Sequence, residues 1–494
     1  MHMCGVVGIF SHQPVNQDIY DSLIHLQHRG QDAAGILTYN KQFHLKKGMG
    51  LVRDIFDQNN MTRLQGKWGL GHTRYPTVGS ADGGVEDAQP FIVTSPYGIA
   101  MAHNGNLTNY TVLKEELFEK DRYHCNSGCD VEVILKTFAS KMHDLDPKND
   151  IFDSICISVK SVFERAIGAY SVVGIIAEKG MIAFRDPHGI RPLVCGMRTN
   201  KDGTKDYIFA SENTMFYPLN FKFMGNVQPG EVVYINQNGE MQSKILVHEK
   251  FTPCVFEHVY LARPDSIIDN VSVYRARLRQ GQNLAKKWKR EHPDILPDVV
   301  VPIPFSSNTA ALSLAHELGV RYTEGLYKNS FVGRTFIMPN QKLREKSVLQ
   351  KLSPQVIELK GKNVMLLDDS IVRGTTSKLI VKLVKDVGAK SVYLVSACAP
   401  VKYPCFYGVD MPTKNDLIAG RMTTEEIKEY IEADILMYQD IEDLEEAITR
   451  KGDHNIDHPC MACLNCKYIT GDINEKKMQE MEKERINERV SEKL

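Results

Sequence analysis

Residues 364–377, V-M-L-L-D-D-S-I-V-R-G-T-T-S, constrain this chain more than any other segment. The first four are apolar and predict a buried strand, and residues 378–387 predict a helix. Between them lie two adjacent acids, Asp368 and Asp369, and a turn rich in hydroxyl groups. Backbone N–H groups of such a loop and helix N-terminus form a phosphate cradle. Carboxylates beside that cradle suit vicinal hydroxyls, so the segment predicts a site for a phosphorylated ribose.

This segment resembles the phosphoribosyl pyrophosphate (PRPP) signature of type I phosphoribosyltransferases. The resemblance implies that the two acids hold the ribose hydroxyls and that residues 373–377 surround the 5′-phosphate. The alternative is an ordinary buried strand with a polar turn, which the order of acids, loop and helix disfavours. The implied PRPP contacts in this segment are Asp368, Asp369, Ser370, Arg373, Gly374, Thr375, Thr376 and Ser377.

Length and composition predict a globular protein of two or three domains. The 494 residues are 43% hydrophobic and 24% charged, and 60 basic residues against 61 acidic ones give a formal charge of −1. This balance offers no argument for a nucleic-acid or membrane partner. No apolar run approaches the roughly 18 residues of a membrane span, and no secretory signal precedes the first motif. The expected location is therefore cytoplasmic.

Two different patterns of secondary structure divide the chain. Residues 4–235 alternate short strand-like runs with turns and two helical patterns, near 19–27 and 131–142, which predicts an α+β layered domain. From about 285 to 400, strands and helices alternate, which predicts a parallel α/β sheet. The expected strands there are 299–302, 364–367 and 391–395, and the expected helices are 309–318 and 377–387.

The C-terminal part follows the same plan. Residues 418–450 predict two acidic helices, and residues 475–494 predict a charged surface helix or a frayed tail. The expected domains are thus 4–235, 236–470 and a charged helical tail at 471–494.

Cys4 is the first candidate nucleophile. If Met1, His2 and Met3 are removed, Cys4 carries a thiol and a free α-amine, and the amine (reference pKa about 7.7–8.0) is the base for the thiol. Taken alone, Cys4 is equally a small buried residue of a first strand. The three preceding residues are either a cloning scar or a very short propeptide, and while they remain the amine is blocked.

Four further motifs accompany this cysteine. They resemble the glutaminase domain of class II glutamine amidotransferases, which are N-terminal-nucleophile (Ntn) hydrolases. The motifs are H-R-G-Q-D-A-A-G at 28–35, G-H-T-R-Y at 71–75, H-N-G-N at 103–106 and R-D-P-H-G-I-R-P-L at 185–193.

The resemblance assigns roles to five residues of the glutaminase. Cys4 would attack the glutamine carboxamide, and Asn104 with the backbone of Gly105 would form the oxyanion hole. Arg74 would bind the α-carboxylate as a bidentate pair, and Asp130 would bind the α-ammonium. A surface ion pair for Arg74 and a helix N-cap for Asp130 are the alternatives, which the joint pattern disfavours.

A glutaminase ahead of a PRPP site resembles the glutamine PRPP amidotransferases over residues 4 to about 470. In that family, ammonia from glutamine displaces pyrophosphate from PRPP and yields 5-phosphoribosylamine, in the first step of de novo purine synthesis. The resemblance implies an α+β Ntn-hydrolase sandwich followed by an α/β parallel-sheet type I phosphoribosyltransferase domain. It also implies glutamine and PRPP as small-molecule substrates, Mg²⁺, feedback inhibition by purine nucleotides, and a homodimer or homotetramer.

Two loops are expected at the pyrophosphate. Residues 302–307 follow a strand where the family binds pyrophosphate, and Ser307 with the two acids would hold magnesium. Family members often carry an acid where Phe305 stands, so this loop is expected to bind in a modified way. Residues 328–336 resemble a mobile loop whose Lys328 and Arg334 would face phosphate groups, the alternative being a solvated basic loop.

The segment 260–266 resembles the connection between the two sites. With Tyr75, it would form an ammonia channel; ordinary interdomain packing is the alternative.

Eleven cysteines do not suggest a secreted disulfide framework. The run C-M-A-C-L-N-C at 460–466 has the spacing of a metal or iron–sulfur site. One branch of the family carries a [4Fe–4S] cluster, and the matching positions here are Cys254, Cys405, Cys460 and Cys463. Zinc or no metal are the alternatives, and Cys466 has no assigned role.

Two alternative functions can be distinguished from an amidotransferase by specific motifs. A hexosamine-phosphate synthase shares the glutaminase domain but has a different acceptor domain, and the acidic segment at 368–377 argues against it. A regulatory protein that senses PRPP without catalysis has no use for Cys4, Arg74, Asn104 and Asp130. Glutamate release that rises with added PRPP would separate both rivals from an amidotransferase.

Overall fold

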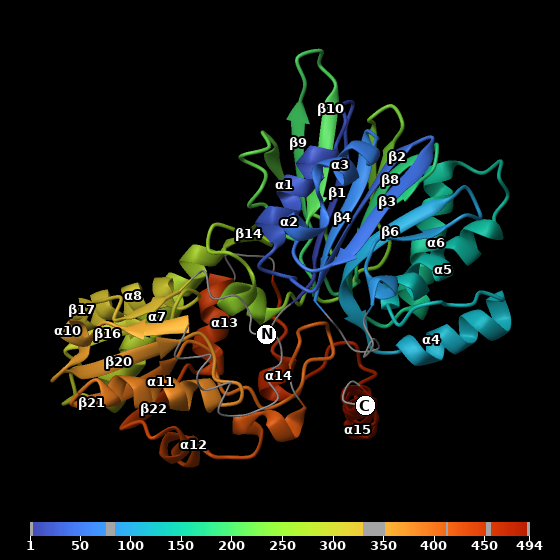
Figure 1. Ribbon diagram of the computed structural model, residues 1–494. Helices are drawn as coiled ribbons and strands as arrows, with labels where there is room; N and C mark the ends of the chain where they lie inside the picture. The colour runs from blue at the N-terminus through green and yellow to red at the C-terminus, as the bar shows by residue number, and fades with distance from the viewer. Residues whose placement is uncertain (1–2, 76–83, 330–350, 412, 451–455, 492–494) are drawn as a thin grey trace.

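The computed structural model describes residues 3–75, 84–329, 351–411, 413–450 and 456–491. Two layered units lie side by side, with the blue-to-green first half at the upper right of Figure 1 and the yellow-to-red second half at the lower left. Among the described residues, no helix is long and apolar enough to cross a membrane.

The first half is a sandwich of two antiparallel sheets with helices on both outer faces. Its helices are α1 (Asn16–Leu26), α2 (Val52–Ile55), α3 (Gln58–Arg63), α4 (Tyr110–Glu116), α5 (Asp130–His143) and α6 (Ile151–Arg165). One sheet has the order β11 (Lys222–Asn226), β9 (Val194–Thr199), β10 (Lys205–Ala210), β1 (Gly5–Phe10), β4 (Trp68–Arg74), β2 (Ala33–Asn40), β3 (Gln42–Met49). The other has the order β13 (Met241–Ile245), β12 (Glu231–Asn236), β8 (Gly180–Arg185), β7 (Gly168–Ile176), β6 (Ile99–Leu107), β5 (Phe91–Val93). The second sheet thus continues to β13, beyond residue 235.

Alternation along β1 shows how the layers form. Val6 packs between the two sheets with Val173 of β7, whereas Val7 faces Leu23 of α1 on the outer side. The outer face of the second sheet is covered by α5 and α6, where Val133 belongs to the same buried cluster as β-strand residues. Period-two burial of this kind requires apolar layers on both sides of each sheet.

The second half contains a five-stranded parallel sheet. Its order is β17 (Arg321–Tyr322), β16 (Val299–Pro302), β20 (Asn363–Asp368), β21 (Ser391–Ser396), β22 (Ile435–Tyr438). Its larger helices are α7 (Val273–Glu291), α8 (Asn308–Leu318), α11 (Thr375–Asp386), α12 (Thr424–Ile431) and α13 (Ile441–Thr449). Shorter elements are the strand pairs β14 (Ile267–Ile268) with β15 (Val271–Ser272) and β18 (Leu326–Lys328) with β19 (Leu352–Pro354), and helices α10 (Val356–Leu359) and α14 (Ala462–Asn465).

Both faces of this sheet are covered by helices. Leu366 of β20 packs with Val384 of α11 on one face, and Leu367 packs with Leu314 of α8 on the other. This arrangement explains the continuous apolar run before the two acids, since a parallel strand is buried on both faces. The last helix, α15 (Glu475–Ser491), lies apart from the parallel sheet and below the first half (Figure 1).

Several elements differ from the sequence expectation. Strand β22 separates α12 from α13 within residues 418–450, where two acidic helices are expected. The edge strand β17 and the helices α6 and α7 are also additional to the expected elements.

A buried ion pair joins the two halves. Arg185, at the end of β8, donates to both carboxylate oxygens of Asp269, at 2.7 and 3.0 Å, and both side chains are almost fully buried. Arg263 and Asp265 form a pair of similar length, 2.8 Å, but it is exposed. The two pairs have the same chemistry in different surroundings.

Asp269→Ala should therefore destabilise the protein far more than Asp265→Ala. Removing Asp269 leaves a buried guanidinium without its counter-charge, which typically costs about 3–5 kcal/mol. Removing Asp265 from an exposed pair should cost less than about 1 kcal/mol. Scanning calorimetry of the full chain should show a clearly lower unfolding midpoint only for Asp269→Ala; equal midpoints would contradict this account.

Candidate active site

The register of β1 and β4 places Cys4 at the end of the first sheet. Gly5 of β1 pairs with Thr73 of β4 in an antiparallel ladder, so that Cys4 falls beside Arg74. Both side chains are buried, with 4% of each residue exposed. Strand pairing thus brings together Cys4 and Arg74, which belong to motifs that are distant in the sequence.

Burial controls the chemistry of the Cys4 thiol. Its Sγ donates to the carbonyl oxygen of Tyr75 at 3.6 Å. Burial raises the pKa of Cys4 to about 11, while Arg74 and Arg29 oppose this rise and Asp130 adds to it. A thiol in this state is a poor nucleophile without a base, because the thiolate is the reactive form.

Asn104 on β6 has the environment expected of a ligand-binding amide. It is fully buried, and neither atom of its side-chain amide has a hydrogen-bond partner among the residues that the structure describes. An unpaired buried amide is costly, typically about 1–3 kcal/mol. Gly105, the next residue, has φ +154°, and a Cβ there would lie 1.9 Å from the oxygen of Ala169. Only glycine fits this position, because a Cβ would collide with the backbone of the neighbouring strand β7.

Asp130 begins α5 and faces the same site. Its Oδ2 accepts a hydrogen bond from the backbone N–H of Leu107 at 3.0 Å, and its Oδ1 lies 3.0 Å from Nε2 of His103. His103 also lies 3.0 Å from the amide of Gln89. His103 has no role in the sequence prediction, although it stands directly before Asn104 in the same motif.

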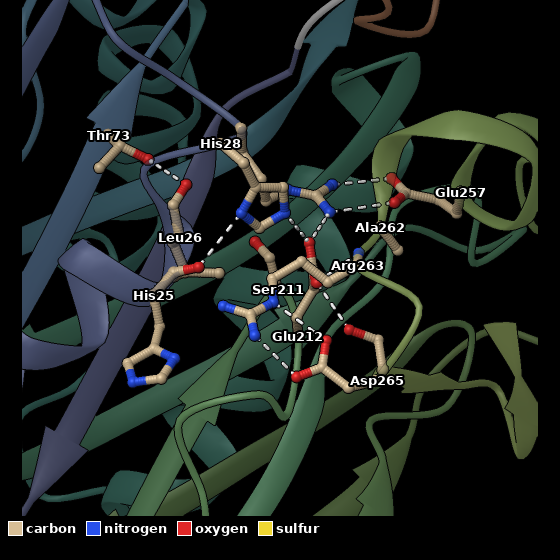
Figure 2. Close-up of polar contacts among 12 residues, drawn as sticks. His25, Leu26, His28, Thr73, Ser211, Glu212, Glu257, Ala262, Arg263 and Asp265 are labelled. Carbon is tan, nitrogen blue, oxygen red and sulfur yellow. Dashed lines mark hydrogen bonds and ion pairs between the residues drawn. The ribbon is translucent and has the colours of Figure 1, made fainter. Parts of the chain in front are cut away.

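A buried network of charged side chains holds the backbone of Cys4 in place. Arg29 donates from Nε to the carbonyl of Cys4 at 3.0 Å, and from its terminal nitrogens to Glu212 at 2.6 Å and Glu257 at 2.8 and 3.0 Å. His28 contacts Glu212 at 2.7 Å, and Figure 2 shows His28, Glu212 and Glu257 pointing toward one another. Burial alone would raise the pKa of Glu212, but His28 and Arg29 hold it well below its usual range.

The PRPP candidates meet at the carboxyl end of β20. A pocket of about 440 Å³ opens there. Its lining includes every residue predicted from the acidic segment, together with three from elsewhere in the chain. The lining residues are Tyr75, Tyr260, Asp368, Asp369, Ser370, Val372, Arg373, Gly374, Thr375, Thr376, Ser377 and Asp410.

The start of α11 has a backbone geometry compatible with the predicted phosphate site. Gly374 is the N-cap with φ +74°, and no side chain caps the helix. The first backbone N–H groups of α11 therefore lack intrahelical partners and point toward the pocket end of the helix. A Cβ on Gly374 would lie 2.5 Å from Ile418, so the turn requires glycine.

Asp368 and Asp369 are adjacent and repel each other when both are ionised. Burial and the neighbouring Asp369 raise the pKa of Asp368 well above its ordinary value, and burial also raises the pKa of Asp369. Ser306 and Ser370 both donate to Asp369. Oxygen ligands with this charge suit a magnesium ion. However, no group of three or more His, Cys, Asp or Glu residues in the described ranges has a metal-holding arrangement.

Of the remaining pyrophosphate candidates, Lys328 lines one of the two pockets at this site and Ser307 lines neither. Lys328 lines a second pocket of about 280 Å³ together with Ser306 and Asp369, and its Nζ lies 5.3 Å from the ring centre of Phe305. Ser307 is buried and donates to the carbonyl of Ile303. Ser306, rather than Ser307, lines this pocket. Arg334 lies outside the described residues.

The four cluster candidates are brought into one buried core. Cys254 and Cys405 come from two distant segments, Cys460 and Cys463 from a third, and all four belong to the same hydrophobic cluster. Cys254 and Cys460 form a parallel β-bridge. The N–H of Tyr407 donates to Sγ of Cys405 at 3.3 Å, a contact common around cluster sulfurs. Four thiolates are the usual ligands of a [4Fe–4S] cluster, but no three or more Cys, His, Asp or Glu side chains in the described ranges are arranged to hold a metal ion.

Comparisons with known proteins agree over the whole chain. A family model described as a glutamine amidotransferase domain matches residues 80–218, and one described as a phosphoribosyl transferase domain matches 269–404. Pseudomonas aeruginosa amidophosphoribosyltransferase is 49% identical over 98% of this chain and 96% of its own length. The Escherichia coli enzyme is 46% identical over 96% and 94%. The chain belongs to the amidophosphoribosyltransferases.

A solved member of the amidophosphoribosyltransferases has the same fold. The glutamine PRPP amidotransferase from B. subtilis, in complex with ADP and GMP, superposes with a TM-score of 0.84 at 36% identity. The match covers 96% of this chain and 98% of that one. These findings confirm the family and the fold class that the sequence predicts.

The pKa of Cys4 generates a prediction for this member of the family. In the chain with Met3 still attached, alkylation of Cys4 by iodoacetamide should be slow at pH 8, since a pKa of about 11 leaves about a hundredfold less thiolate than an ordinary thiol has. The rate should rise about tenfold per pH unit from pH 7 to 10, as followed by peptide mass spectrometry. Cys466, which is partly exposed, is the internal control. A plateau for Cys4 below pH 9 would contradict the effect of burial.

Proposed function

We propose that this chain makes 5-phosphoribosylamine from PRPP and glutamine, with glutamate and pyrophosphate as the other products. This reaction is the first step of de novo purine synthesis. One observation carries the proposal: the ribose-phosphate pocket at the end of β20 adjoins a second pocket that reaches Arg29 behind Cys4. A glutaminase and a PRPP site are therefore next to each other in one chain.

In the first half-reaction, Cys4 acts after residues 1–3 are removed. Its α-amine takes the thiol proton, and the sulfur attacks the glutamine carboxamide. The amide of Asn104 and the N–H of Gly105 stabilise the oxyanion, a contribution typically worth about 3–4 kcal/mol per donor. Arg74 and Asp130 bind the α-carboxylate and the α-ammonium. The α-ammonium of Cys4 returns the thiol proton to the leaving nitrogen, ammonia leaves, and water hydrolyses the thioester to glutamate.

In the second half-reaction, ammonia attacks C1 of the ribose and pyrophosphate leaves. Asp368 and Asp369 hold the ribose hydroxyls, and the N–H groups at the start of α11 bind the 5′-phosphate. Lys328 faces the pyrophosphate, whereas the role of Arg334, outside the described residues, rests on the sequence resemblance alone. A magnesium ion, held through Asp368 and Asp369, would supply positive charge for the leaving group. Ser307 is not among the proposed ligands, because its hydroxyl donates to the carbonyl of Ile303.

The two pockets are the proposed route for ammonia. The smaller one is lined by His28 and Arg29 at the glutaminase end and by Ser306 and Asp369 at the other. Tyr260 and Asp369 line both pockets, which supports a channel function for Tyr260. Ammonia that passes between the sites without entering bulk water would avoid protonation.

Two further assignments rest on the relatives. The B. subtilis protein binds ADP and GMP in its solved structure, which supports feedback inhibition of this chain by purine nucleotides. A [4Fe–4S] cluster on Cys254, Cys405, Cys460 and Cys463 is supported by their burial in one core. The buried guanidinium of Arg191 lies beside Cys254 and would offset the negative charge of four thiolates.

A pair of variants should separate the two half-reactions. Cys4→Ala should lower glutamine-dependent synthesis at least about 10³-fold and leave synthesis from added ammonia intact, because only the first site uses the thiol. Asp369→Asn should lower both activities, because both need PRPP. Asp386→Asn, an exposed acid at the far end of α11, is the control. Loss of ammonia-dependent activity in Cys4→Ala would contradict separate sites.

Metal analysis should test the cluster directly. Protein purified without air should contain about four iron atoms per chain and show broad visible absorption. Cys463→Ser should lose both signals, whereas Cys466→Ser should keep them. One zinc per chain and no visible band would support the zinc alternative, and the absence of both metals would leave four buried thiols.

A further inference from the structure

A segment of the second half, residues 405–410, packs directly on strand β6 of the first half. The side-chain amide of Asn106 donates to the carbonyl of Phe406 at 3.0 Å. Gly408, with φ +98°, lies so close to Gly105 that a Cβ would stand 2.9 Å from its carbonyl carbon and 3.0 Å from its oxygen. Backbone from the phosphoribosyl half therefore touches the residue next to Asn104.

Gly105 is also confined by the neighbouring strand β7. It pairs with Tyr170 in the β6–β7 ladder, where the backbone of Ala169 allows no Cβ. An oxyanion donor must lie about 2.7–3.1 Å from the developing charge, so displacement by a few tenths of an ångström weakens it. The close backbone contact of Gly408 thus limits how far Gly105 can move.

The segment is held by contacts within the second half. Cys405, Tyr407 and Val409 belong to one buried core, and Asp410 lines the ribose-phosphate pocket. The hydroxyl of Tyr407 lies 2.8 Å from that of Thr470. The backbone that contacts Gly105 is therefore fixed to the second half.

We propose that Gly408 is a positioning residue for glutamine hydrolysis, because it holds the oxyanion donor Gly105 in place from across the domain boundary. The inference rests on the proposed role of Gly105 in the oxyanion hole. Any side chain at Gly408 must displace backbone, since the contact atoms belong to the main chain of Gly105.

The test compares Gly408→Ala with Gly203→Ala in a chain that begins at Cys4. Gly203 has a similar φ of +89°, but a Cβ there meets nothing within 4 Å, so it controls for backbone strain alone. Gly408→Ala should lower kcat for glutamine hydrolysis about 10–100-fold, with KM changed less than about threefold, since removing a whole donor costs about 10²–10³. Gly203→Ala should change neither parameter.

Two readouts separate positioning from general damage. Synthesis from ammonia should stay within about twofold in Gly408→Ala, because it does not use the oxyanion hole. Alkylation of Cys4 by iodoacetamide should also keep its rate, because displacement at a saturated carbon forms no oxyanion. A parallel loss of hydrolysis, alkylation and ammonia-dependent synthesis would mean a merely structural role and would overturn the proposal.

Asn106→Ser is the second variant, for use if Gly408→Ala does not fold. It removes the hydrogen bond to Phe406 and should lower kcat about 3–10-fold in the same selective manner. Unchanged kcat in both variants, or in Asn106→Ser alone where only it folds, would overturn the proposal. Persistent glutamine hydrolysis in Cys4→Ala would instead show that the proposed function itself has failed.

Discussion

The side chain of Arg29 is the interaction on which the geometry of both halves depends. It is fully buried, holds the carbonyl of Cys4, and pairs with Glu212 of the first half and Glu257 of the second. Burial alone would lower the pKa of Arg29, but Glu257 and Glu212 raise it above its usual value, so the guanidinium stays charged. Removing one member of such a group leaves an uncompensated buried charge, which typically costs about 3–5 kcal/mol. The nucleophile is therefore positioned by the domain boundary itself.

The turn that carries Glu257 extends this connection to the second pocket. Residues Glu257–Leu261 form one π-helical turn, whose Tyr260 lines both pockets. Arg277 of α7 donates to the carbonyls of His258 and Ala262, at 3.0 and 2.8 Å, and so holds this turn against the second half. A displacement of the turn would move Tyr260 and Arg29 together. This is a physical reason for the two sites to change in concert.

The sequence predicts those elements and site residues whose characteristic pattern lies within a short continuous segment. The apolar run and acids of β20, with the helix that follows, are local, and so are the motifs around Cys4 and Asn104. Strand β22 is different: its four apolar residues gain their partner only through pairing with β21, and short apolar runs do not distinguish strand from helix. In α7, the buried Arg277 interrupts the apolar stripe and conceals the helical period. Cross-domain contacts such as Gly408 with Gly105 leave no trace in local sequence at all.

Substrate in the ribose-phosphate pocket should change the ionisation of Asp368 and Asp369. Asp369 is buried and its neighbour Asp368 is half-buried, and loss of hydration raises the pKa of both, which disfavours ionisation of the two side by side. Positive charge brought with the substrate, as Mg²⁺ or from Lys328, relieves this repulsion and favours the ionised pair. Asp369 also lines the pocket that reaches Arg29, so a change in its ionisation would act on both pockets. In the proposed mechanism, acceptor binding would therefore change the electrostatics along the proposed ammonia route through this one carboxylate.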